Sequence, residues 1–162
     1  MEALILTVLL TSVPLIFAAT GELVAERSGV LNLGVEGMML MGAVSAFAAT
    51  SIFGNPYVGI LAGALAGAMT AAVFSLFALG LATNQVATGL ALTIFGSGLS
   101  GLVGAPFVGS TVDGLPNLAI PLLNDIPIIG NLLFNHDIMA YLSIVSLVLV
   151  AWFLNRTRAG LV

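Results

Sequence analysis

The sequence predicts an all-α protein, a polytopic bundle of transmembrane helices, and its composition carries this prediction. Hydrophobic residues make up 60% of the 162 residues and charged residues only 6%, whereas a soluble domain carries about a quarter charged residues. The mean hydropathy is +1.21. A chain with so little polar surface cannot face water on all sides, so we assign residues 1–162 to a single transmembrane domain in the lipid bilayer.

The same composition excludes several kinds of chemistry. The chain has no cysteine, which removes disulfides and thiol metal sites. It also has no lysine, so it cannot form the lysine-containing phosphate loop of an ATPase. Three arginines without a basic patch give no support for nucleic-acid binding. We therefore expect no catalytic residues, no metal and no cofactor on this chain; any ATP that drives it would be bound by a separate ATPase subunit.

The apolar stretches are long enough to cross a membrane. A helix rises about 1.5 Å per residue, so a hydrocarbon core of about 30 Å requires about 20 apolar residues. The first stretch is a retained span rather than a signal peptide, because Glu2 stands where a basic region would be needed. Pro14 should kink it. Five stretches qualify approximately: Ala3–Thr20, Leu33–Phe53, Val58–Ala82, Val86–Val108 and Ile138–Leu154.

The arginines predict the orientation. Arg27 lies in the first connection, and Arg156 and Arg158 follow the fifth of five alternating crossings. Four crossings separate the two regions, so all three arginines lie on one side. The positive-inside rule makes that side cytoplasmic, with the N-terminus outside and the C-terminus inside. The long loop 109–137 contains no arginine and falls outside. Its prolines alternate with isoleucine and leucine, so we expect a re-entrant or interfacial element there.

Small residues predict where the spans meet. Lipid tails are as apolar as leucine, so close backbone packing rather than burial must hold the helices together. In the third span, Gly59, Gly63 and Gly67 recur every four residues and form a smooth helix-packing face. The fourth span is also rich in glycine, towards Pro106, which indicates either tight packing or a broken helix.

Glu36 is the main polar residue that requires an explanation, because an ionisable group at membrane depth is costly. A helix that begins near Asn32 or Leu33 places Glu36 about one turn in, where free amides and the helix dipole favour a carboxylate. Glu36 is then either a helix-start carboxylate that locks the first connection or, with Asn32, part of a substrate pathway. The charges at Glu22–Arg27 are expected to form a water-facing turn.

A second polar cluster precedes the fourth span. Asn84, Gln85 and Thr88 lie at its start, and Asn84 and Thr88 share one helical face that continues to Phe95. A face of amide, hydroxyl and aromatic groups suits a polar, ring-bearing solute, so these residues are candidates for the substrate pathway. The alternative is that Thr83 or Asn84 caps the helix and that the remaining groups bond to neighbouring helices.

Four blocks, in order, resemble the membrane permease subunits of bacterial ABC importers: "SGVLNLGVEGMMLMGA", "ATNQVATGLAL", "IPIIGNLLFNHDIMAYLS" and "NRTRAGL". The most similar branch imports nucleosides and simple sugars and is related to ribose and galactose permeases. The resemblance implies alternating access in the bacterial cytoplasmic membrane, with nucleosides favoured over sugars. It also implies three kinds of partner: ABC ATPase subunits, a second permease subunit and an extracytoplasmic solute-binding protein.

The length departs from this family. Its members are about twice as long and continue, after the stretch matching "RTRAGL", into a cytoplasmic coupling segment and further spans. The chain therefore resembles an N-terminal half without the coupling segment and the C-terminal spans. Two other functions remain open: a self-contained small oligomeric channel or carrier, and an inactive permease fragment.

Overall fold

The computed structural model describes residues 2–116, 118–119, 135–157 and 160. Within them, five helices are long and apolar enough to cross a membrane, as predicted. A two-residue strand pair, β1 (Leu118–Ala119) with β2 (Asn135–His136), is antiparallel. The helices are α1 (Glu2–Arg27), α2 (Val35–Phe53), α3 (Pro56–Ser75) with a π-helical turn at Leu76–Gly80, α4 (Gln85–Gly104) with a 3-10 turn at Ala105–Phe107, and α6 (Ile138–Arg156).

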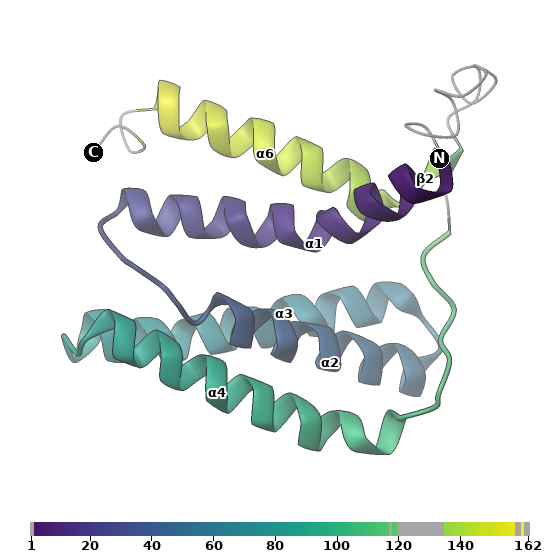
Figure 1. The fold of residues 1–162 in the computed structure, drawn as a ribbon, viewed down its shortest axis with the longest axis horizontal. Helices are drawn as coiled ribbons and strands as arrows, with labels where there is room; N and C mark the ends of the chain where they lie inside the picture. The colour runs from purple at the N-terminus through teal and green to yellow at the C-terminus, as the bar shows by residue number, and fades with distance from the viewer. Residues whose placement is uncertain (1, 117, 120–134, 158–159, 161–162) are drawn as a thin grey trace. The chain divides into compact units, whose positions relative to one another are not determined.

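Contacts divide the chain into two compact units, Met1–Ser28 with Leu115–Val162, and Gly29–Gly114. In the first unit, α1 packs along α6 (Figure 1). In the second unit, α2 packs against both α3 and α4. The re-entrant or interfacial element expected in the 109–137 loop falls mostly on residues 117 and 120–134, which lie outside the described residues.

The helix α1 is longer than the sequence predicted, and the expected water-facing turn at Glu22–Arg27 was wrong. Those residues are helical because glutamate, leucine, alanine and arginine are all good helix formers. The helix ends just afterwards, where the N–H of Ser28 donates to the carbonyl oxygen of Ala25 at 3.0 Å. Gly29 follows with φ of +79°, the left-handed conformation with which helices commonly terminate. The first connection is therefore only Ser28–Gly34.

The turn between α2 and α3 is set by two residues. Gly54 has φ of +63°, which a residue with a side chain rarely adopts. The Oδ1 atom of Asn55 then accepts a hydrogen bond from the N–H of Tyr57 at 2.9 Å and so caps α3. Pro56 occupies the first helical position, where no N–H is needed. The two helices consequently run antiparallel as a tight hairpin.

Two of the three glycines predicted to form a packing face in α3 lie against α2. A Cβ atom built on Gly63 would be 2.9 Å from the carbonyl oxygen of Gly42, and one on Gly59 would collide with the hydroxyl of Thr50. Gly67 differs: a Cβ atom there would meet nothing within 4 Å. The four-residue spacing continues through Gly67, but among the described residues no neighbouring backbone approaches it.

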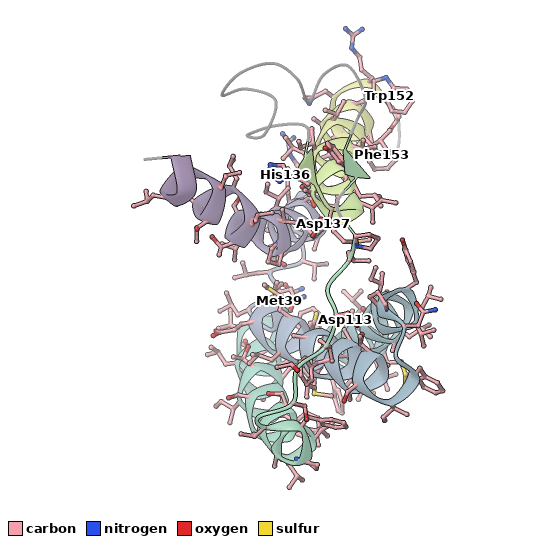
Figure 2. The ribbon with its side chains drawn as sticks, turned by 90° about the vertical axis from the view of Figure 1, so that its right-hand side faces the viewer. Met39, Asp113, His136, Asp137, Trp152 and Phe153 are labelled. Carbon is pink, nitrogen blue, oxygen red and sulfur yellow. The ribbon has the colours of Figure 1, made fainter. Side chains whose placement is uncertain are left out.

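Most of the helix surface is apolar and exposed. In the apolar stretch of each spanning helix, only 6–17% of the residues are buried within the structure. Ile94 and Leu102 of α4, for example, are 75% and 74% exposed. Figure 2 shows such side chains projecting outward from the helices, including Trp152 and Phe153 near the end of α6. Such apolar faces must be covered by lipid or by another protein, as they are in an integral membrane protein.

Candidate functional site

The two polar clusters predicted from the sequence lie together. The Oε1 atom of Gln85, at the start of α4, accepts a hydrogen bond of 2.8 Å from the backbone N–H of Leu31. About two turns further along α4, the hydroxyl of Thr93 donates to the carbonyl oxygen of Leu33 at 2.9 Å. These bonds join residues 54 and 60 positions apart. The starts of α2 and α4 thus form one site.

The Val30–Gly34 segment that enters this site is not helical. Its leucines, Leu31 and Leu33, are 40% and 43% exposed, so it is the backbone that faces α4. The side chain of Asn32 supports the segment from within, because its Oδ1 atom accepts from the N–H of Gly34 at 2.9 Å and its Nδ2 atom lies 3.6 Å from the sulfur of Met38. Where water is scarce, backbone groups outside a helix need such partners.

Glycines allow α4 and the start of α2 to approach at backbone distance. A Cβ atom on Gly37 would be 2.6 Å from the carbonyl oxygen of Leu92, and one on Gly96 would be 2.7 Å from the carbonyl oxygen of Gly37. A Cβ atom on Gly89 would be 2.8 Å from the backbone nitrogen of Leu33. No side chain fits at these three positions without moving the main chain, so the site is rigidly packed.

Asn84 caps α4, one of the two interpretations that the sequence allowed for it. Its Oδ1 atom accepts from the N–H of Ala87 at 3.0 Å, while the Thr88 hydroxyl donates to the Asn84 carbonyl oxygen at 2.9 Å. The hydroxyls of Thr83 and Thr88 are 2.8 Å apart and hydrogen-bonded. Phe95 is 58% exposed. The cluster is ordered at the helix start, and contact with a solute stays a prediction.

Glu36 is the second residue of α2, because the helix begins at Val35 rather than near Asn32 or Leu33. The capping residue, Gly34, supplies no side chain to the free amides of the first turn. A carboxylate at this position is favoured by those amides and by the helix dipole. The Glu36 side chain is exposed, which leaves it open to a partner or a solute beyond the residues described.

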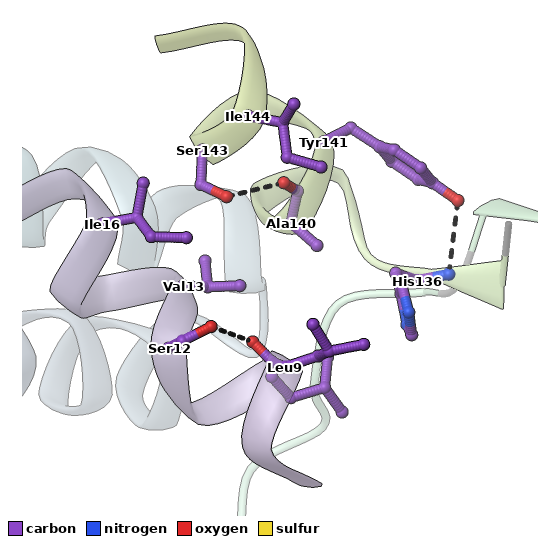
Figure 3. Close-up of a pocket in the computed structure, with 10 residues that line it drawn as sticks. Leu9, Ser12, Val13, Ile16, His136, Ala140, Tyr141, Ser143 and Ile144 are labelled. Carbon is purple, nitrogen blue, oxygen red and sulfur yellow. Dashed lines mark hydrogen bonds between the residues drawn. The ribbon is translucent and has the colours of Figure 1, made fainter. Parts of the chain in front are cut away.

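The first unit contains a separate, apolar cavity of about 100 Å³ between α1 and α6 (Figure 3). The hydroxyls of Ser12 and Ser143 face it, but each donates to a carbonyl oxygen of its own helix, at 2.7 Å. At its edge, the backbone N–H of His136 donates to the hydroxyl of Tyr141 at 3.5 Å. The cavity therefore suits apolar chains better than polar solutes. No cluster in the described part of the chain could hold a metal ion.

Thr93 and the close glycines were not predicted as site residues. Thr93 lies in an apolar stretch, and nothing nearby in the sequence signals its bond to Leu33. The glycines left a weak signal: Gly89 and Gly96 are seven residues apart on one face of α4, opposite Gly34 and Gly37. Matching small residues on two helices indicate a close crossing, but the sequence does not identify the partner.

Comparison with known proteins identifies a protein family and three similar proteins. The family described as branched-chain amino acid transport system / permease component matches residues 4–162. A putative glucose ABC transporter permease of Haloferax volcanii is 38% identical over 91% of this chain and 46% of its own length. The nucleoside ABC transporter permease NupC of Lactococcus lactis is 29% identical over 99% of this chain and 54% of its own length. The guanosine ABC transporter permease NupQ of Bacillus subtilis is 30% identical over 94% of this chain and 52% of its own length. The chain spans about half the length of these relatives, and no solved structure matches it.

Proposed function

Because the chain belongs to the family of branched-chain amino acid transport system permease components, we propose that it forms part of the permease of an ABC importer. The permease moves nucleosides or simple sugars across the cytoplasmic membrane by alternating access. It performs no covalent chemistry. A separate subunit hydrolyses ATP, which agrees with the lack of lysine in this chain.

The main structural support for the proposal is that the starts of α2 and α4 form one site with polar side chains and non-helical backbone. Transport proteins commonly place interrupted helices and irregular backbone where a solute or ion passes, because such backbone is satisfied inside a membrane only where it is buried in protein or lines a water-filled cavity. The Val30–Gly34 segment is such a backbone, and Asn32 and Gln85 bring amides to it. By the arginine rule both helix starts face the cytoplasm, so the site forms the inner mouth of the solute path.

Partners follow from the same proposal. The importer contains ABC ATPase subunits, a second permease subunit and an extracytoplasmic solute-binding protein that delivers the solute to the outer side. The exposed apolar faces of the helices supply surface for lipid and for neighbouring spans. A self-contained channel remains the competing function, and it requires neither ATP nor a binding protein.

A nucleoside is the favoured solute. Two of the three relatives compared carry nucleoside or guanosine in their names and one carries glucose. The chain contributes an exposed aromatic ring, Phe95, on the helix that begins with Asn84 and Gln85. An aromatic ring and amide groups match the flat face and polar edge of a nucleobase, although sugars also stack on aromatic rings.

The test is uptake by proteoliposomes that contain the chain, its ATPase, its permease partner and its solute-binding protein. We expect guanosine uptake that requires both ATP and the binding protein, with glucose as the compared solute. Glu36→Gln should reduce uptake more than Asp113→Asn, which removes the same charge from an exposed residue of the outer segment. Uptake that proceeds equally without ATP would instead support the channel.

A further inference from the structure

The Val30–Gly34 segment is held by its backbone at two points, and Asn32 lies between them. Gln85 accepts from the N–H of Leu31, and Thr93 donates to the carbonyl oxygen of Leu33. We call these two bonds the backbone clasp. Both partners come from α4, so a single rigid helix fixes the segment on each side of Asn32. Glu36 follows within the first turn of α2.

The surroundings leave the clasp little room to shift. Gly89 of α4 meets the backbone of Leu33 and Gly34 with no space for a Cβ atom, and Gly96 meets Gly37 in the same way. Val30 and Met38, at the two ends of this stretch, pack against the buried cluster of Phe74, Ala78 and Leu92. A segment packed this closely has few alternative positions while its hydrogen bonds to α4 are intact. The two bonds therefore help to determine where Asn32 and Glu36 lie.

We propose that Gln85 and Thr93 are positioning residues: through the backbone clasp, α4 sets the placement of Asn32 and Glu36 at the inner mouth of the solute path. The inference rests on the proposed function. The sequence left two interpretations of Gln85, a residue of the substrate pathway or one that bonds to a neighbouring part of the bundle, and the clasp favours the second. In the clasp, the Oε1 atom of Gln85 is already engaged by Leu31, and its effect on a solute passes through the segment that it holds.

Matched variants separate the hydrogen bonds from side-chain volume. Thr93→Val keeps the shape but removes the donor to Leu33, whereas Thr93→Ser keeps the hydroxyl. Gln85→Leu removes the acceptor for Leu31, whereas Gln85→Glu retains an oxygen. Loss of either hydrogen bond releases the segment from α4 and should lower the maximal rate of ATP-dependent uptake about ten-fold. Thr93→Ser should restore uptake to within about two-fold of the wild type.

A double-substitution experiment tests whether Gln85 acts through Glu36. In the complete importer, we measure maximal uptake for Glu36→Gln, Gln85→Leu and both together. Positioning predicts that Gln85→Leu costs less than about two-fold once Glu36→Gln is present, because residues that act as a unit are not additive. A full ten-fold loss in both backgrounds would mean that Gln85 affects stability or another step, and would overturn the inference. Equal uptake by Thr93→Val and Thr93→Ser would overturn it as well.

Hydrogen exchange at the Leu31 amide gives a readout that does not depend on transport. The clasp predicts slow exchange in the wild type and at least ten-fold faster exchange in Gln85→Leu, with the rest of α4 unchanged. Unchanged exchange would overturn the clasp even if transport occurs. A wild-type complex that transports no nucleoside or sugar would refute the proposed function, and with it the role assigned to the clasp, while exchange would still report the hydrogen bond itself.

Discussion

Replacement of Gly96 by alanine tests the close crossing of α2 and α4. The new Cβ atom would lie 2.7 Å from the carbonyl oxygen of Gly37, and ordinary contact begins at 3.4 Å, so the helices would have to separate by about 0.7 Å. The obstacle is backbone rather than a flexible side chain, and no rotamer change can relieve it. Overpacking of this kind costs about 1–3 kcal/mol.

Gly98 supplies the matched control on the same helix. A Cβ atom there meets nothing within 4 Å, so Gly98→Ala gains the same helix propensity without a collision. The difference between the two variants therefore isolates the contact. For a chain of this size, 1–3 kcal/mol corresponds to a fall in Tm of about 2–12 °C.

The assay is thermal unfolding of each purified variant in the same detergent, followed by circular dichroism, which reports the loss of helix in both compact units. We expect Gly96→Ala to melt about 2–12 °C below Gly98→Ala. If both variants melt at the same temperature, or if Gly98→Ala is the less stable, the close crossing of α2 and α4 is wrong.

Three further predictions concern local structure and use the same unfolding assay. Asn84→Ala removes the oxygen that caps α4 and should cost about 0.5–2 kcal/mol, whereas Asn84→Asp keeps the cap; equal stability of the two would contradict the capping role. Asp137→Ala should lose a similar amount at the start of α6, where Oδ1 accepts from the N–H of Ala140 at 2.9 Å, and Asp137→Asn should not. Gly59→Ala should destabilise the α2–α3 hairpin because of Thr50, whereas Gly67→Ala should be neutral, and the reverse order would show that the hairpin is misplaced.

The five spans were predictable because they depend on quantities that are local in sequence. Hydropathy and length located each span, and turn residues such as Gly54 and Asn55 located a boundary. The error at the end of α1 has a local cause as well. The charges of Glu22–Arg27 indicated water, and water was equated with a turn, although a helix can extend past the membrane surface into water.

The site was predictable only in its parts. Asn32, Glu36 and Gln85 stood out because polar groups are rare in this chain, and Asn84 was recognisable as a helix cap. Their assembly was not predictable, since a hydrogen bond between Gln85 and the backbone of Leu31 has no sequence signature at the leucine. A contact that joins a side chain to a backbone group 54 positions away can be found only once the fold is known. The π-helical turn at Leu76–Gly80 lies within the expected span Val58–Ala82 and was not predicted.

The account depends most on one claim: the helices cross a bilayer and carry the starts of α2 and α4 to its cytoplasmic side. The chain has no cysteine, so a single introduced thiol is the only one present. In intact cells, a membrane-impermeant maleimide should label Asp113→Cys but not Glu36→Cys, and in inverted vesicles the order should reverse. Labelling of Glu36→Cys from outside, or of both positions from the same side, would contradict the account.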